Sequence, residues 1–157
     1  MLLHKARAAI GDWTPLCQDC GALCNRACCM PDEDGDGGMF LFPGEEALIP
    51  AGFRIYREEG LFAPIAMCGG TCDRDARPLA CRIFPLTPVY QNGVWKVRMD
   101  ARARSLCPLA RSGVRGLQPE FARAVTRAMR IIAADPAGEA FLHGWQAVEE
   151  PFRAFRL

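Results

Sequence analysis

The clearest hydrophobic pattern lies in the last third of the chain, where it predicts a helix. Apolar residues recur there every three or four positions, so they share one helix face; they are Leu117, Phe121, Ala124, Val125, Ala128, Met129 and Ile132. Pro119 suits the first turn, because proline lacks the amide hydrogen that a first turn leaves unpaired. We interpret the apolar face as part of a hydrophobic core.

A second helix is predicted to follow directly, which makes residues 117–150 the helical part of the protein. Asp135 suits the N-cap and Pro136 the first helical position, and Pro151 is predicted to end the helix. Its buried stripe is predicted to consist of residues four and three positions apart, which are Phe141, Trp145 and Val148.

Short extended segments are predicted earlier in the chain. The apolar run Met39–Phe42 lies between a glycine and a proline and suits a buried strand. A short helix is predicted over Glu45–Ile49, and a second extended segment begins at Phe53.

A β-hairpin is predicted from Leu86 to Met99. Two β-rich runs flank Asn92-Gly93, and Asn-Gly favours the tight turn that joins two antiparallel strands. Pro88 lies in the first run and cannot donate a ladder hydrogen bond, so this strand should lie at a sheet edge.

Length and composition indicate one small globular domain. The chain has 157 residues, of which half are apolar and 24% are charged, and no apolar run reaches the roughly 18 residues of a membrane span. The first residues carry charges and do not resemble a secretory signal, so we expect a cytoplasmic protein with no membrane partner. The expected fold is a small single-domain α+β protein over residues 1–157. Metal-stapled cysteine loops, at least one β-hairpin and two C-terminal helices are its expected parts.

Charge is unevenly distributed along the chain. Residues 1–75 hold 12 acidic and six basic residues, whereas residues 76–157 hold six acidic and 13 basic residues. The segment from Arg98 to Arg130 carries eight arginines, which would suit a nucleic-acid surface. We favour the alternative, in which the arginines neutralise metal-bound thiolates and face solvent along a helix. Nucleic acid is therefore not the expected partner.

The cysteines carry the strongest chemical signal. They are Cys17, Cys20, Cys24, Cys28, Cys29, Cys68, Cys72, Cys81 and Cys107. A dense, odd-numbered set in a cytosolic protein favours metal or redox chemistry over a disulfide framework. Cys17 and Cys20 are spaced so that two thiolates on one turn can bind one ion at about 2.3 Å. No single short segment holds four ligands at a standard spacing, so distant loops must assemble the site.

The pattern resembles the YkgJ-like family, which is named for its CxxCxxCC motif and described as zinc- or iron-chelating. The resemblance covers about residues 14–110. It rests on Cys17-x2-Cys20, Cys28-Cys29, Gly37–Glu46 (GGMFLFPGEE), Cys68-x3-Cys72, Arg77–Pro85 (RPxxCRxFP) and Cys107-Pro108. It implies an eight-cysteine metal centre made of Cys17, Cys20, Cys28, Cys29, Cys68, Cys72, Cys81 and Cys107. Cys24 falls in a stretch longer than the family's motif and could replace one of its neighbours as a ligand.

The residues leave the identity and number of the metal ions open. Thiolates suit both zinc ions and iron–sulfur clusters, and the first cysteine segment matches neither common ferredoxin spacing. The adjacent cysteines could serve two ions, or one could bind while the other packs. Four arginines next to cysteines either donate hydrogen bonds to sulfur or are solvated; they are Arg26, Arg74, Arg77 and Arg82.

The expected function is therefore metal binding, with zinc or iron as the cofactor and the iron either as an ion or in an iron–sulfur cluster. One alternative is an iron–sulfur redox or methyltransferase-like enzyme, because a flagellin lysine methylase looks like a relative of the family. No glycine-rich nucleotide loop supports that activity in this sequence. A second alternative is a zinc-dependent nucleic-acid-binding module that uses Arg98 to Arg130.

Overall fold

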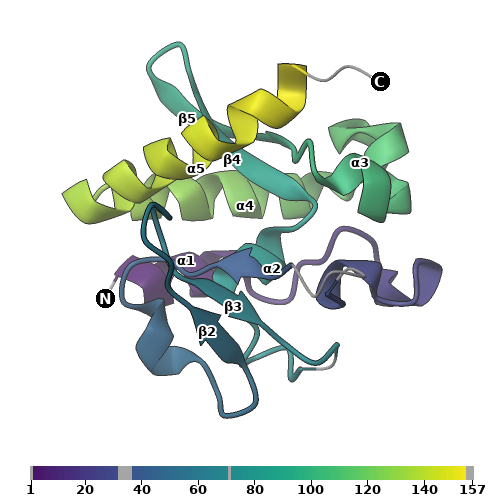
Figure 1. Ribbon diagram of the computed structural model, residues 1–157. Helices are drawn as coiled ribbons and strands as arrows, with labels where there is room; N and C mark the ends of the chain where they lie inside the picture. The colour runs from purple at the N-terminus through teal and green to yellow at the C-terminus, as the bar shows by residue number, and fades with distance from the viewer. Residues whose placement is uncertain (1, 32–36, 71, 155–157) are drawn as a thin grey trace.

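The computed structural model describes residues 2–31, 37–70 and 72–154. Its helices are α1 (Leu2–Ile10), α2 (Leu79–Ile83), α3 (Ala103–Leu106), α4 (Pro119–Ile132) and α5 (Pro136–Ala154). One antiparallel sheet has the order β1-β3-β2 and contains β1 (Met39–Phe40), β2 (Arg54–Tyr56) and β3 (Ile65–Met67). The second is the hairpin of β4 (Leu86–Gln91) and β5 (Val94–Met99). The expected mixture of helices and small antiparallel sheets is confirmed (Figure 1).

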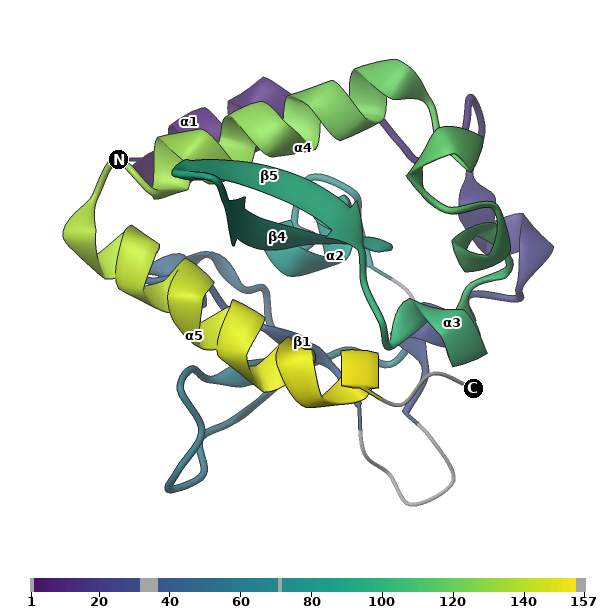
Figure 2. The ribbon, with the colours of Figure 1, turned by 90° about the horizontal axis from the view of Figure 1, so that it is seen from above.

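The hairpin forms where the sequence predicts it. Its strands pair from Leu86 with Met99 to Gln91 with Val94. Asn92 and Gly93 both have positive φ angles, of 53° and 78°, the conformation that an Asn-Gly turn favours. Both strands of a two-stranded sheet are edge strands. Pro88, which cannot donate a ladder hydrogen bond, therefore lies at a sheet edge as predicted. Figure 2 shows the hairpin between α4 and α5, against which its two strands pack.

The predicted face of α4 is buried, but two expectations about α5 are wrong. Phe141 and Trp145 are buried, whereas Val148 is exposed and Glu149 takes the buried position next to it. Glu149 is buried because its carboxylate accepts hydrogen bonds from Arg98 and from the amide of Ala101. Pro151 does not end the helix, which continues to Ala154. It lies in the last turn, where one missing amide hydrogen interrupts little of the helix.

The first helix was not predicted from the sequence. α1 lies alongside α4 in both Figure 1 and Figure 2 and packs against it. Its buried residues are Leu3, Ala6 and Ile10, so a narrow apolar stripe on a nine-residue helix completes one side of the core.

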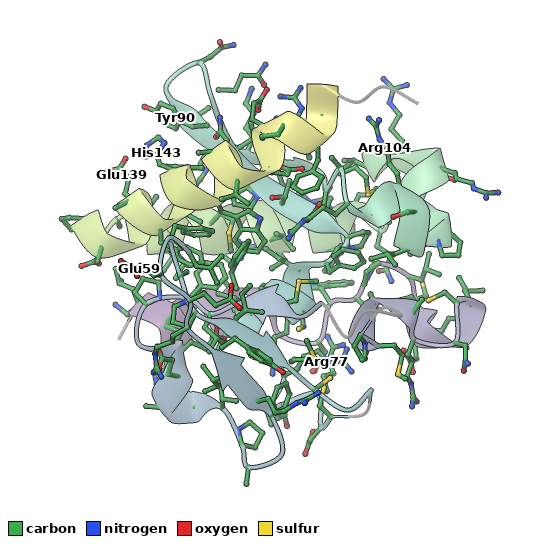
Figure 3. The ribbon with its side chains drawn as sticks, viewed as in Figure 1. Glu59, Arg77, Tyr90, Arg104, Glu139 and His143 are labelled. Carbon is green, nitrogen blue, oxygen red and sulfur yellow. The ribbon has the colours of Figure 1, made fainter. Side chains whose placement is uncertain are left out.

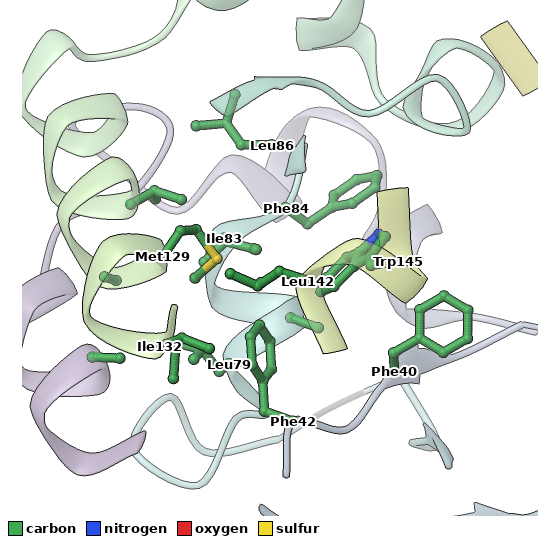
Figure 4. Close-up of a cluster of buried hydrophobic side chains, with 14 of the residues drawn as sticks. Phe40, Phe42, Leu79, Ile83, Phe84, Leu86, Met129, Ile132, Leu142 and Trp145 are labelled. Carbon is green, nitrogen blue, oxygen red and sulfur yellow. The ribbon is translucent and has the colours of Figure 1, made fainter. Parts of the chain in front are cut away.

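The core lies between the helices and β1, as the close-up in Figure 4 shows. Trp145 is its largest buried side chain and contacts the rings of Phe40 and Phe42 edge-on, at centroid distances of 5.8 and 5.7 Å. Leu79 and Ile83 of α2 are fully buried in the same core. The packing of these two residues fixes the position of α2, which also carries Cys81. Within the described ranges, no helix combines the length and apolar character needed to cross a membrane.

Candidate metal centre

The first cysteine segment folds into two consecutive 3-10 turns, Cys20–Leu23 and Ala27–Cys29. The carboxylate of Asp19 accepts a hydrogen bond from the amide of Gly21 at 3.0 Å and caps the first turn. The amide of Arg26 then donates to the carbonyl of Gly21, also at 3.0 Å, and closes the segment on itself. These short-range bonds bring cysteines from both turns to the same end of the molecule. That end lies beside α3 in Figures 1 and 2.

The loop after β3 brings Cys68 and Cys72 to the adjacent cysteine pair. Gly70 has a φ of +92° and lies so close to Met30 that a Cβ atom added to it would be 2.6 Å from the Met30 sulfur. The thiol of Cys68 donates a long hydrogen bond to the carbonyl oxygen of Cys29 at 3.8 Å. A glycine in the left-handed conformation is thus needed where this loop meets the first segment.

Cys81 is positioned by α2, which a buried carboxylate ties to two other parts of the fold. One oxygen of Glu45 accepts from the amide of Leu79 at 2.7 Å and from the guanidinium of Arg7 at 3.2 Å. The other accepts from the amide of Phe42 at 3.1 Å. The start of α2 is therefore fixed to α1 and to the chain after β1, and Cys81 lies two residues into that helix.

Cys107 comes from the end of α3 and is buried. α3 packs against the 3-10 turn that carries Cys28 and Cys29. Cys28, Cys81 and Cys107 also contact the hydrophobic core. The side chains of these three cysteines therefore adjoin the packed interior.

The cysteines gather around one cavity of about 850 Å³. Eight of the nine line it, and they are Cys17, Cys20, Cys24, Cys28, Cys29, Cys72, Cys81 and Cys107. Cys68 does not line the cavity but contacts Cys29, as described above. All nine are free thiols. Of the eight residues predicted as ligands, the structure therefore brings seven to one cavity and the eighth to its edge.

The exposure of two cysteines differs from what the family motif suggests. Cys17, which the motif includes, is exposed at the rim, whereas Cys24, which falls outside the motif, is half-buried. No sequence signal indicated this position of Cys24, because Asn25 and Arg26 have positive φ angles and interrupt the segment between its two short 3-10 turns.

Burial makes four of the thiols poor acids. Burial is the first cause that raises the pKa of Cys20, Cys68, Cys81 and Cys107. The adjacent pair differs, because their sulfur atoms are 4.0 Å apart, at the distance of a weak hydrogen bond between the two thiols. That contact raises the pKa of Cys28 and lowers the pKa of Cys29, and Arg77 and Arg26 lower the pKa of Cys29 further. Cys29 is therefore the thiol of this pair that ionises first.

The four arginines predicted to lie near the ligands all line the cavity, but they differ in their contacts. Arg77 lies beside the thiol of Cys72, and Figure 3 shows sulfur atoms next to this labelled arginine. Arg74 and Arg82 donate instead to backbone carbonyls, those of Trp13 at 3.0 Å and of Arg74 at 2.8 Å. Arg77 therefore lies where it can offset negative charge on the Cys72 sulfur, while Arg74 and Arg82 hold the loop that follows Cys72.

Coordination is not preformed in the described part of the chain. Among residues 2–31, 37–70 and 72–154, no three Cys, His, Asp or Glu side chains are close enough together to hold an ion. The donor chemistry nevertheless fits zinc or iron, since thiolate sulfur is their common ligand. Closing a site would require the sulfur atoms to come closer together than they stand here.

No family model, curated protein or solved structure matches this chain. The resemblance to the YkgJ-like family therefore rests on the motif residues alone.

Three arginines of the arginine-rich segment make contacts within the protein. Arg98 pairs with the buried Glu149 at 2.8 Å, and Arg102 pairs with Asp100 at 2.6 Å. Arg130 donates to the carbonyl of Trp95. These contacts favour a structural role for these three arginines.

Proposed function

We propose that the protein binds zinc or iron through the cysteine thiolates around its cavity. The observation that carries the proposal is the convergence of free thiols from four separate parts of the chain on one cavity. They come from the first cysteine segment, which contains the two 3-10 turns, from the loop after β3, from α2 and from the end of α3. Ordinary buried thiols have no reason to gather in this way, because a thiol packs as a small apolar group anywhere in a core.

The charge around the cavity supports the proposal. Several thiolates close together repel one another, and burial raises the pKa of Cys20, Cys68 and Cys107, so these three thiols stay protonated without a compensating cation. A bound cation would replace those protons and stabilise the thiolates. Arg77 supplies part of the same compensation.

The positions of the cysteines support loop closure on an ion. Cys20, Cys28 and Cys29 stand on 3-10 turns of three or four residues, which have few hydrogen bonds to break. Cys81 and Cys107 stand against the core and would serve as fixed points. A metal would then staple the cysteine loops to the packed part of the fold, which is the role the sequence suggests.

The test is elemental analysis of protein purified anaerobically without added metal, together with its absorption spectrum. We expect zinc or iron in stoichiometric amount. Zinc without colour would identify a zinc-binding protein, and iron with acid-labile sulfide and a brown colour an iron–sulfur protein. A reduced, folded protein that neither contains nor takes up either metal would refute the proposal.

A second candidate is the iron–sulfur enzyme. The observation that favours it is the size of the cavity, about 850 Å³, which lies in the range of small-molecule sites. Iron together with sulfide, and binding of a small molecule beside the cluster, would favour this candidate over metal binding alone.

A further inference from the structure

The cavity is lined by arginines as well as by cysteines. They are Arg26, between the two 3-10 turns, Arg74 and Arg77, in the loop before α2, and Arg82, on α2. A guanidinium group binds carboxylate and phosphate well, because its N–H donors can meet two oxygens at once. The partners that these arginines have within the protein therefore decide whether the cavity can hold an anion.

The acidic residues that line the cavity do not neutralise these arginines. They are exposed, and they are Asp12, Asp19 and Asp73. The carboxylates of Asp19 and Asp73 accept hydrogen bonds from the backbone amides of Gly21 and Asp75, both at 3.0 Å. In the part of the chain that the structure describes, none of the three forms an ion pair with an arginine.

Arg82 carries a largely buried charge with weak compensation. Its side chain is 8% exposed, and it pairs with Asp75 at 3.7 Å, where the carboxylate side chain is 93% exposed. Such a pair contributes little, because water screens the exposed partner. One terminal nitrogen of Arg82 donates to the carbonyl of Arg74 at 2.8 Å. Its Nε is buried and has no hydrogen-bond partner among residues 2–31, 37–70 and 72–154.

Arg77 shows the same deficit beside it. The carbonyl of Arg74 accepts from the amide of Arg77 as well as from the guanidinium of Arg82, which places these residues next to each other. The Nε of Arg77 is also buried, with no partner in the described ranges. The Nε of Arg98 is unpaired too, but Arg98 faces the buried Glu149 at 2.8 Å. Buried donors are normally hydrogen-bonded, and an anion in the cavity would offer acceptors to both Arg77 and Arg82.

The remaining lining offers apolar surface for an organic molecule. Leu23, Met39, Phe84 and Leu109 line the cavity, and Met39 and Phe84 are buried residues of the core. The volume of about 850 Å³ lies in the range of small-molecule sites. An inorganic ion alone would leave most of this space unfilled, so the cavity suits a ligand with an apolar body and one charged group.

We propose that the cavity binds a small organic anion, whose carboxylate or phosphate group is held by Arg77 and Arg82 while its apolar part contacts Met39 and Phe84. This inference goes beyond the metal-binding function proposed above. It does not require the metal, because no cysteine is among the residues that hold the anion.

Two probes with the same ring and different charged groups test the proposal. Phenyl phosphate and benzoate are titrated by calorimetry into the reduced full chain, purified anaerobically with the metal that it carries. We expect at least one of them to bind with a stoichiometry of one, and the probe that binds identifies the charged group. The matching ion without the ring, inorganic phosphate or acetate, should bind more weakly. In zinc-containing or metal-free protein, NMR should show the Nε–H signals of Arg77 and Arg82 shifting on binding.

Substitutions of the two arginines give the decisive comparison. Arg77→Met and Arg82→Met should each weaken binding at least about tenfold, because each removes charge-assisted hydrogen bonds. Arg82→Lys keeps the charge but loses the planar fork, so its affinity should fall between those of wild type and Arg82→Met. Arg104→Met is the matched control. Arg104 is exposed on α3, away from Arg77 in Figure 3, and its variant should bind like wild type. Circular dichroism verifies that each variant is folded.

Each failure has its own signature. The inference would be overturned if neither probe bound at millimolar concentration, or if folded Arg77→Met and Arg82→Met bound as tightly as wild type. Equal affinities with and without the ring would overturn the assignment of an organic ligand. Metal analysis of the same samples separates the two proposals. Protein that holds zinc or iron but no anion would keep the metal-binding function alone, and protein that binds the anion but takes up no metal would keep this inference alone.

Discussion

Glu45 offers the sharpest test of how the fold supports the cavity, because its carboxylate is fully buried and bonded to three donors. In Glu45→Gln the remaining oxygen can still accept from Arg7 and Leu79. The new amide nitrogen must then face the amide of Phe42, and two donors cannot bond each other. That buried N–H loses its partner at a cost of about 1–3 kcal/mol.

A second loss adds to the first, because Arg7 is mostly buried and no longer faces a charge. Burial raises the pKa of Glu45, which means that removing the charged carboxylate from water costs free energy. The neutral glutamine avoids part of this desolvation cost. We therefore expect a net destabilisation of about 2–3 kcal/mol. Urea unfolding of the reduced, metal-free protein, followed by tryptophan fluorescence, measures it.

The neighbouring Glu46→Gln is the matched control. Glu46 pairs with Arg57, whose side chain is 64% exposed, and exposed ion pairs contribute little. We expect a change within about 0.5 kcal/mol. The reasoning would be refuted if the two variants were equally stable, because the hydrogen bonds of Glu45 would then contribute nothing to the anchoring of α2.

Three further predictions concern the cavity and the core. Arg77→Met removes a positive charge that lowers the pKa of Cys29, so alkylation of Cys29 in metal-free protein should slow at neutral pH and recover in alkaline solution. Peptide mapping of an iodoacetamide time course measures this, and an unchanged rate at neutral pH would contradict it. Leu142→Ala should cost about 2–5 kcal/mol by leaving a cavity in the core, while Val148→Ala, at an exposed position, should cost little. Equal melting temperatures for the two variants would disprove that contrast. Removing bound metal with a chelator should increase hydrogen exchange in residues 14–31 more than in α4. Uniform exchange changes would count against a metal that orders the loops.

The parts of the fold that the sequence predicts are those in which local chemistry agrees with the final packing. The hairpin follows from Asn92-Gly93, whose positive φ angles suit the turn, and α4 follows from a long amphipathic pattern. α1 was not predicted, because its apolar stripe consists of only three buried residues and Lys5 and Arg7 stand between them in the sequence. Its burial depends on α4, which lies more than a hundred residues away in the chain.

The candidate metal centre was likewise predictable from the sequence only in part. That cysteines from distant loops gather at one cavity could be inferred from their number and from the lack of a complete local motif. The exposure of Cys17 and the partial burial of Cys24 could not, because they depend on how the chain around the two 3-10 turns folds against the rest of the protein. The burial of Val148 was predicted wrongly for a similar reason, since Glu149 finds partners in Arg98 and Ala101 that no helical periodicity reveals.

The position of Cys107 at the end of α3 has a consequence for the protein while it is being synthesised. Cys107 follows Cys20 by 87 residues, so at about 5–20 residues per second the ribosome needs roughly 4–17 seconds to make the chain between them. Through that interval the earlier thiols exist without the partner that α3 later brings to them. Under the proposed metal-binding function, an ion that arrived so early would meet an incomplete set of ligands, and correct loading would have to wait until translation has passed α3.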